Sequence, residues 1–269
     1  MKALNRITVP RLPLKEFFLL ARDAGCDAVE VRNDLPGGEI FDGLSEDEVR
    51  RLSEEHSIRI VTINALQRFN DVKKHLQRRT DELRRLAETA QKAAVDAVVL
   101  CPVNDPDEQR SYGQRMEDTV TALSAFGSVF REAGVLGYIE PLGFTHCSLR
   151  SKKDALQAIT ESGYHECFRI VHDTFHHFLS GDVKLYPQDT GIVHMSGVLP
   201  GRPQHQITDA DRVLVTREDV MSTRQQVQTL TDQGFSGCFS FEPFSQDVQN
   251  LDVSMLTEQL KQSFSLLFD

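Results

Sequence analysis

Short runs of hydrophobic residues alternate with longer amphipathic stretches along the whole chain. Most of the runs hold four to six residues and are rich in valine or isoleucine, which is typical of parallel strands buried on both faces. The pattern predicts eight strands, at Leu4–Val9, Ala28–Val31, Ile58–Ile63, Ala97–Cys101, Leu136–Glu140, Phe168–Asp173, Gly191–Met195 and Cys238–Phe241.

The stretches between these runs carry the start and stop signals of helices. Ser45 and Glu48 have the spacing of a capping box, and several stretches stop at a glycine, as helices with a left-handed C-cap do. The segment after Asp173 is too short for more than a turn or two of helix. The predicted helices are Leu14–Ala24, one that opens at Ser45, Val72–Ala94, Arg110–Ala133, Lys152–Ser162, Glu218–Gln233 and Ser254–Phe268.

Eight strands joined by helices indicate an α/β protein, either a closed barrel or an open, doubly wound sheet. The count of eight favours the barrel, and so does the lack of a GxGxxG motif after the first run. The length of 269 residues also suits one (β/α)8 barrel of ~250 residues. No Pro/Gly/Ser-rich linker divides the chain. We therefore predict a single-domain TIM barrel over residues 1–269.

Composition and charge narrow the function classes. The formal net charge is -10, which disfavours a partner with a phosphate backbone, since nucleic-acid binding needs a positive surface. Basic residues between Lys73 and Arg85, Lys74 included, are interleaved with acidic ones, as on a solvated helix face. No apolar run reaches the ~18 residues of a membrane span, and the N-terminus lacks the apolar core of a secretion signal. The five cysteines are scattered, so we expect reduced thiols and a cytoplasmic protein. The sequence allows a homo-oligomer without predicting one.

Candidate chemistry lies where the predicted strands end, because the active sites of TIM barrels form at the carboxyl ends of their strands. Glu140 ends the fifth run, Asp173 the sixth and Glu242 follows the eighth, while His194 lies near the end of the seventh. Three carboxylates and one imidazole suit a divalent ion such as Mn²⁺, Zn²⁺, Co²⁺ or Mg²⁺. Taken alone, Asp173 could equally be the N-cap of the next helix. Four consecutive strands with such residues favour the metal site.

Loop residues extend this predicted site. His176 follows Asp173 by three residues, and His177 competes with it for a place in the pocket. Arg212, in the long loop after the seventh run, could hold a substrate oxygen. Cys147 beside His146 is only a weak candidate for a nucleophile.

Three polar residues on the predicted strands have less certain roles. Glu30 and Arg32 end the second run, and a salt bridge between them is not expected. Their roles stay open. His172 alternates with Asp173 along the sixth run, so it is expected to point outward to the helices.

At these residues the sequence resembles the xylose isomerase-like TIM barrel superfamily of sugar isomerases and epimerases. Within it, the similarity is greatest to the inosose isomerases (2-keto-myo-inositol isomerases) of inositol catabolism. Two segments depart from the pattern, HMSGVLPG after the seventh strand and DRVLVTRED in the following loop. The resemblance rests on VEVR (29–32), INALQRFN (63–70), IEPLGFTHCSLRS (139–151), VHDTFHHFLSGD (171–182), ITDADRV (207–213) and SFEPF (240–244).

The resemblance implies that Glu140, Asp173, His194 and Glu242 bind one divalent metal ion. It further implies that the two glutamates act as acid and base, and that His176 and Arg212 contact a sugar or cyclitol substrate. The expected reaction is isomerisation or epimerisation of a hydroxy-ketone, a keto-inositol above all, by proton transfer through a cis-enediolate. Alternatives are a ketose 3-epimerase, a hydroxypyruvate isomerase, an enzyme similar to inosose dehydratase, and a non-catalytic sugar-binding barrel.

Overall fold

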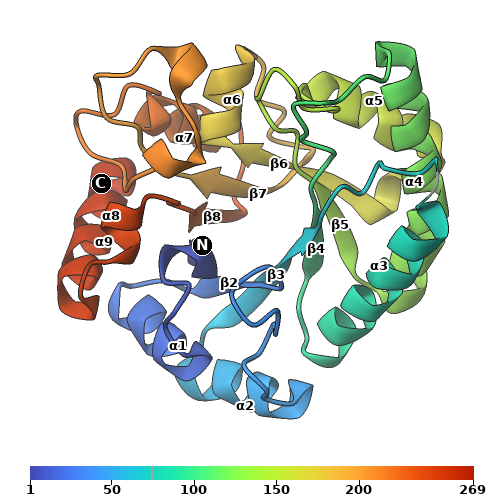
Figure 1. The fold of residues 1–269 in the computed structure, drawn as a ribbon. Coiled ribbons are helices and arrows are strands. Elements are labelled where there is room, and N and C mark those ends of the chain that lie inside the picture. The colour runs from blue at the N-terminus through green and yellow to red at the C-terminus, as the bar shows by residue number, and fades with distance from the viewer. Residues whose placement is uncertain (74) are drawn as a thin grey trace.

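Eight parallel strands close into a barrel in the order β1-β2-β3-β4-β5-β6-β7-β8, and helices surround it on the outside (Figure 1). This is a computed structural model, and it describes residues 1–73 and 75–269. The predicted (β/α)8 barrel is confirmed. Lys74, in the predicted Val72–Ala94 helix, lies outside the described residues.

The strands match the eight predicted hydrophobic runs to within a few residues. They are β1 Lys2–Asn5, β2 Ala28–Arg32, β3 Arg59–Leu66, β4 Ala97–Leu100, β5 Leu136–Ile139, β6 Phe168–Asp173, β7 Thr190–Met195 and β8 Cys238–Phe241. The helices are α1 Leu14–Asp23, α2 Glu46–His56, α3 Leu76–Lys92, α4 Tyr112–Ala133, α5 Lys152–Ser162, α6 Thr174–Ser180, α7 Thr223–Asp232, α8 Gln246–Gln249 and α9 Val253–Phe268.

Capping explains where most of these helices begin and end. Ser45 and Glu48 exchange both bonds of the predicted capping box at the start of α2. Gly134 and Gly163 end α4 and α5 in the left-handed conformation, as the sequence predicted. The short segment after β6 forms the two turns of α6, which is also in line with prediction.

Several predicted boundaries are wrong, among them the start of the third helix, which is Leu76 and not Val72. Side-chain hydrogen bonds explain three others. The first strand stops at Asn5 because the Asn5 side chain accepts from the Ile7 amide and begins a 3₁₀ turn. The fourth helix begins after Arg110 because Ser111 caps it. The seventh begins at Thr223 instead of Glu218, since Asp219 accepts hydrogen bonds from the amides of Val198, Met221 and Thr223 and holds this segment in a turn.

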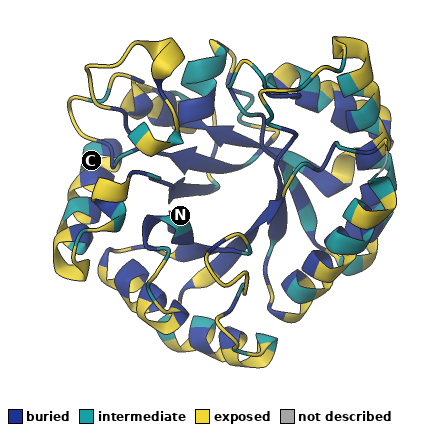
Figure 2. Ribbon diagram, in the orientation of Figure 1, coloured by how far each residue is buried: buried dark blue, intermediate teal, exposed yellow. Residues whose placement is uncertain are grey.

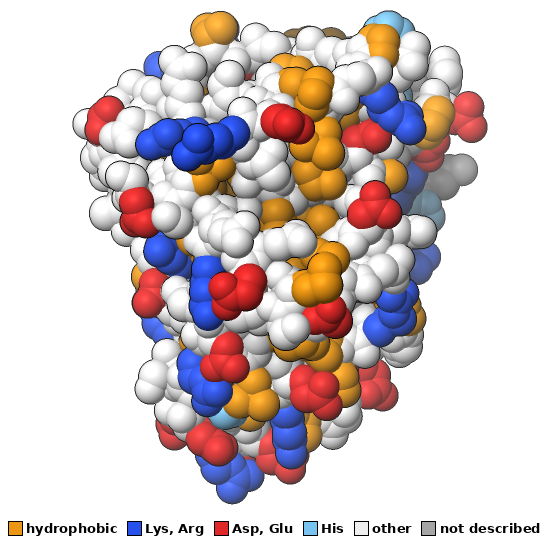
Figure 3. Space-filling view, turned by 90° about the vertical axis from the view of Figure 1, so that its left-hand side faces the viewer, with side chains coloured by type: hydrophobic (Ala, Val, Ile, Leu, Met, Phe, Trp, Pro, Cys, Tyr) orange, Lys and Arg blue, Asp and Glu red, His pale blue; other side chains and the backbone are white. Residues whose placement is uncertain are grey.

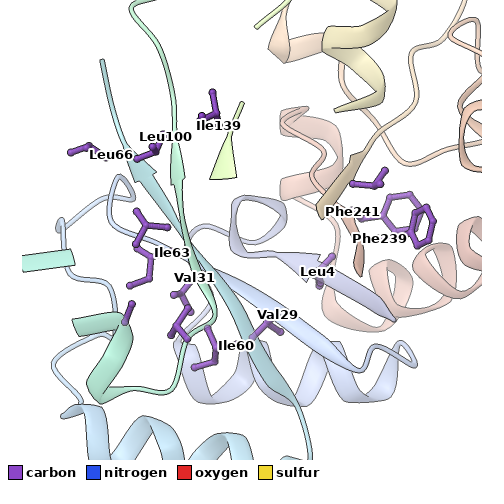
Figure 4. Packing of buried hydrophobic residues seen from close by; sticks show 14 of the residues in the cluster. Leu4, Val29, Val31, Ile60, Ile63, Leu66, Leu100, Ile139, Phe239 and Phe241 are labelled. Carbon is purple, nitrogen blue, oxygen red and sulfur yellow. The ribbon is translucent and has the colours of Figure 1, made fainter. Parts of the chain in front are cut away.

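Hydrophobic residues pack in two layers, one on each side of the barrel wall. Larger side chains such as Leu4, Val29, Ile63 and Phe241 fill the space between strands and helices (Figure 4). Figure 2 shows the strands buried and the outer faces of the helices exposed. The barrel interior holds mainly smaller residues, at Ala3, Ala28, Val61, Ala65, Val99, Cys101, Val171, Ile192 and Cys238, with Tyr138 packed against them.

The alternation of side chains along each strand positions the site. In β2, Val29 and Val31 belong to the outer hydrophobic layer, so Glu30 and Arg32 point into the barrel. Towards the carboxyl ends of the strands, this inward row changes from apolar to polar. The barrel therefore has an apolar base and a polar upper end.

The outer surface carries charges of both signs. On the side shown in Figure 3, acidic and basic side chains are interspersed, and hydrophobic side chains reach the surface in a band between them. Val253 and Met255, at the start of α9, are among the exposed hydrophobic residues. In the described part of the chain, no helix combines the length and the apolar character needed to cross a membrane.

Candidate metal centre

Four predicted ligands converge at the polar end of the barrel. Glu140 follows β5, Asp173 ends β6, His194 lies in β7 and Glu242 follows β8, and all four are buried. One potential ligand atom from each lies within 4.8 Å of the others. Neighbouring parallel strands end at one rim, so residues far apart in sequence meet here.

The imidazole of His194 lies in the middle of this group. Its Nδ1 is 2.8 Å from Glu140 Oε1, 3.2 Å from Glu242 Oε2 and 3.9 Å from Asp173 Oδ2. Burial would lower the pKa of His194, but the charges of Glu30, Glu242 and Glu140 raise it well above its ordinary value. A protonated imidazole thus compensates carboxylates that would otherwise repel one another. A donor set of three carboxylates and one imidazole, drawn together around a positive charge, fits a divalent cation.

Glu30 holds the far side of the same imidazole, and it was not among the predicted site residues. The Nε2–H of His194 donates to Glu30 Oε2 over 3.0 Å. Glu30 also accepts from Thr62 Oγ1 at 2.6 Å, from Asn64 Nδ2 at 2.9 Å and from Asn5 Nδ2 at 3.2 Å. These bonds keep the carboxylate in place inside the barrel. The alternation of β2 was the signal that could have identified it.

Arg212 reaches the cluster from the long loop after β7. Its Nη2 donates to Asp173 Oδ2 at 2.8 Å and to Glu242 Oε2 at 3.0 Å. Its guanidinium also lies over the ring of Phe175, 5.0 Å from the centroid. The loop is drawn back to the barrel by a bridge between Gly197 and Val213. The resemblance implied a place for Arg212 in the pocket, and the structure puts it beside two candidate ligands.

Asp173 lies where both of the roles that the sequence left open, helix cap and metal ligand, are geometrically possible. Its Oδ1 caps α6 by accepting from the amides of Phe175 at 2.7 Å and His176 at 3.1 Å. Its Oδ2 faces His194 and Arg212. The cap therefore fixes the carboxylate and directs its second oxygen, which accepts from Arg212, towards the cluster.

Of the two competing histidines, His176 is the one whose backbone amide contacts a candidate ligand, Asp173. It follows Asp173 at the start of α6 and is buried, and its Nδ1 has no hydrogen-bond partner among the described residues. His177 instead lies 2.6 Å from Lys152 Nζ and packs against His172. His172 Nε2 donates to Gln226 Oε1 of α7 at 3.0 Å, so it points outward as predicted. An unpartnered buried nitrogen is uncommon in proteins and marks His176 as a candidate ligand-binding group.

Two cysteines have buried, protonated thiols. Cys101 donates to Glu140 Oε2 over 3.5 Å, and burial together with the Glu140 charge raises its pKa. Cys147 donates to the carbonyl of Leu149, and burial raises its pKa to about 11. A thiol of this kind is a poor nucleophile. The contact of Cys101 with Glu140 could not be read from the sequence.

Comparison with known proteins gives a family match along nearly the whole chain. The family model described as xylose isomerase-like TIM barrel matches residues 18–267. A search of curated proteins gives no match.

Several solved structures are similar over the full length. A xylose isomerase domain-containing protein from Salmonella typhimurium LT2 is 35% identical with a TM-score of 0.91, covering 100% of this chain and 97% of that one. The IolI protein, described with a bound zinc atom, is 21% identical with a TM-score of 0.89, covering 99% and 97%. D-Psicose 3-epimerase with D-tagatose, from Clostridium cellulolyticum H10, is 13% identical with a TM-score of 0.76, covering 99% and 97%.

Proposed function

Because the chain belongs to the xylose isomerase-like TIM barrel family, we propose that it is a divalent-metal-dependent isomerase or epimerase of a hydroxy-ketone sugar or cyclitol. A keto-inositol is the favoured substrate, as for the inosose isomerases that the sequence resembles. The observation that carries the proposal is the convergence of four ligand atoms from four consecutive strands. The zinc atom named for IolI supports a metal cofactor.

Glu140, Asp173, His194 and Glu242 would hold one divalent ion, of which Mn²⁺, Zn²⁺, Co²⁺ and Mg²⁺ are the candidates. When bound, such an ion acts as a Lewis acid that polarises a carbonyl and the hydroxyl beside it. The protein supplies the groups that move protons and orient the substrate.

The two glutamates approach the site from strands separated by β6 and β7, so each would face a different side of the substrate. Their second oxygens differ. Glu140 Oε2 has the weak thiol donor Cys101, whereas Glu242 Oε1 accepts from Arg32 at 2.9 Å and from Asn5 at 3.2 Å. An oxygen held by a guanidinium accepts a further proton less readily. We therefore assign Glu140 to removing the proton from the hydroxyl-bearing carbon, and Glu242 to returning one from the other side.

Arg212 and His176 would orient the substrate. The guanidinium of Arg212 is held by Asp173, Glu242, Asp209 and Ser196, so its one remaining Nη1–H would point at a fixed angle. A substrate hydroxyl at His176 Nδ1 would satisfy a nitrogen that has no partner within residues 1–73 and 75–269. Both contacts would position the carbon that loses its proton.

The test is substitution of each glutamate together with solvent exchange. Glu140→Gln and Glu242→Gln keep the side chain's size and an oxygen ligand but remove the basic carboxylate. Each should abolish turnover while retaining at least part of the metal. Wild-type protein with metal should introduce deuterium from D₂O at the carbon next to the carbonyl of its substrate. NMR on a panel of ketoses and inososes measures this exchange. Glu55→Gln, on the exposed face of α2, serves as the matched control.

Other outcomes would assign a different reaction on the same residues. Turnover with the substrate hydrogen retained would indicate a hydride shift, with both glutamates as ligands only. Loss of water from the substrate would indicate a dehydratase. Tight metal and sugar binding without exchange would indicate a non-catalytic sugar-binding barrel.

A further inference from the structure

Two buried guanidinium groups, of Arg32 and Arg212, lie beside the candidate ligands. Both donate to the Glu242 carboxylate. Arg32 Nη1 lies 2.9 Å from Glu242 Oε1, and Arg212 Nη2 lies 3.0 Å from Glu242 Oε2. Both also lie over the ring of Phe244, 5.6 Å and 4.7 Å from its centroid. In many enzymes such groups bind a substrate phosphate or carboxylate. Their other partners determine whether they can do so here.

Arg32 is held in a two-pronged pair by Asp34. Its Nε donates to Asp34 Oδ1 at 2.8 Å and its Nη2 to Asp34 Oδ2 at 2.7 Å. The remaining Nη1 donates to Glu242 and to Asn5 Oδ1. This fork-to-carboxylate geometry is the one that an anionic substrate group would need. Asp34 occupies it already.

Arg212 is engaged in a similar way. Besides Asp173 and Glu242, it contacts Asp209 Oδ1 through Nη1 at 3.3 Å and donates from Nε to Ser196 Oγ at 3.2 Å. Three carboxylates thus surround one guanidinium. Neither arginine presents an uncompensated positive charge.

The net charge of the complete site also disfavours an anionic substrate group. Six carboxylates belong to it: the three candidate ligands, and Glu30, Asp34 and Asp209, which contact His194 or the two arginines. Two guanidiniums and a divalent ion offset four of these charges, leaving two negative charges when His194 is neutral. The net charge of the whole chain, -10, adds repulsion of the same sign.

We propose that the site is selective for uncharged polyhydroxylated ketones and rejects substrates with a phosphate or carboxylate group, with Asp34 as the specificity-determining residue. The inference rests on the proposed function and narrows its substrate class. It predicts that free sugars and cyclitols are substrates, and that sugar phosphates and hydroxypyruvate are not. Asp34 makes this selection because its carboxylate occupies the Nε and Nη2 donors of Arg32, which an anionic substrate group would otherwise use. Among the described residues, Arg32 is the partner of the Asp34 side chain.

The first test measures anion binding directly, with sulfate as a tetrahedral dianion. Asp34→Asn removes the charge that compensates Arg32, and its exposed position leaves the fold little affected. Asp96→Asn is the matched control, because it removes the same charge from the Arg59 pair at the opposite end of the barrel. By calorimetry on zinc-loaded protein, we expect Asp34→Asn to bind sulfate at least about tenfold more tightly than wild type, which corresponds to about 1.4 kcal/mol. Wild type and Asp96→Asn should agree within about twofold. Equal affinities in all three proteins would overturn the proposal.

The second test needs no variant and compares D-fructose with D-fructose 6-phosphate on the wild-type protein. We expect the phosphate to bind no more tightly than the free sugar. Tighter binding of the phosphate by tenfold or more would overturn the proposal. Deuterium exchange into scyllo-inosose is followed in parallel. Its absence would count against the proposed function alone, since the sulfate and sugar-pair affinities do not depend on turnover.

Discussion

His194 is held between carboxylates on both sides, with Glu140 and Glu242 at Nδ1 and Glu30 at Nε2. If Nδ1 binds the metal, the hydrogen bond from Nε2 to Glu30 sets the tautomer and the plane of the ring. Such outer carboxylates also make the imidazole a better ligand, and their loss costs about 10- to 100-fold in metal affinity. At this scale, the site depends on residues that do not touch the ion.

The variant Glu30→Gln tests this arrangement. It keeps the side chain's shape, but it loses the charge and puts an amide among the donors Asn5, Thr62 and Asn64. We expect zinc to bind about 10- to 100-fold more weakly in competition with a chelator. Glu55→Gln should bind zinc as wild type does. Unchanged zinc affinity in Glu30→Gln would remove Glu30 from the site.

Arg212 gives a second prediction at the residue scale. Arg212→Ala should raise KM or lower kcat, because it removes a buried group that orients the substrate, while metal content by elemental analysis stays intact. The matched control is Arg202→Ala in the same loop, whose side chain is 61% exposed and pairs with Asp211. If Arg212→Ala turns over the natural substrate like wild type, Arg212 only stabilises the loop.

At the scale of elements, the close packing of α4 on its neighbours limits which residues it can carry. Gly127 faces Tyr164, and a Cβ at this position would lie 2.0 Å from Tyr164 Cγ. Gly113, near the start of the same helix, has nothing within 4 Å of the corresponding point. The two glycines lie in the same helix, but a Cβ would be crowded at Gly127 and unhindered at Gly113.

Gly127→Ala should therefore destabilise the barrel by about 1–3 kcal/mol through overpacking. Gly113→Ala should be neutral or stabilise it by up to about 1 kcal/mol, because alanine loses less backbone entropy in a helix. Urea unfolding followed by circular dichroism measures both free energies. Equal effects in the two variants would show that Tyr164 moves aside.

For the whole molecule, His194 couples stability to pH in the metal-free protein. Its pKa is raised in the folded state, so its contribution is complete below the unfolded value of about 6.5 and is lost as pH rises through the folded pKa. From about pH 6.5 to 8, the free energy of unfolding of metal-free wild type should fall relative to His194→Ala, by at most about 1.4 kcal/mol per pH unit. Lys152, whose pKa is lowered to about 8, titrates in both proteins and cancels in the difference.

A bound divalent ion should take over the role of that proton. Added Mn²⁺ should therefore stabilise wild type more at pH 8 than at pH 6.5, measured as a shift in Tm, since metal and proton compete for His194. His194→Ala should fold but bind Mn²⁺ more weakly. A Tm shift in His194→Ala equal to that of wild type would exclude His194 as a ligand.

The sequence alone determined the fold class and the four converging residues. Strands buried on both faces must be apolar runs, so their number and order could be counted, and the residues at their ends were bound to share one rim. Glu140, Asp173, His194 and Glu242 were found in this way. Local capping patterns also located α2 and the ends of α4 and α5.

Only the tertiary structure decided the contacts around that rim. Glu30 meets His194 across 164 residues, and Arg32 meets Glu242 across 210. The pairing of Arg32 with Asp34 and the thiol contact of Cys101 with Glu140 likewise depend on side-chain directions set by the closed barrel. A local pattern gives the period of an element and its ends, because these arise from neighbours along the chain. It does not predict which inward side chains come into contact, because barrel closure and strand register set the distances between them.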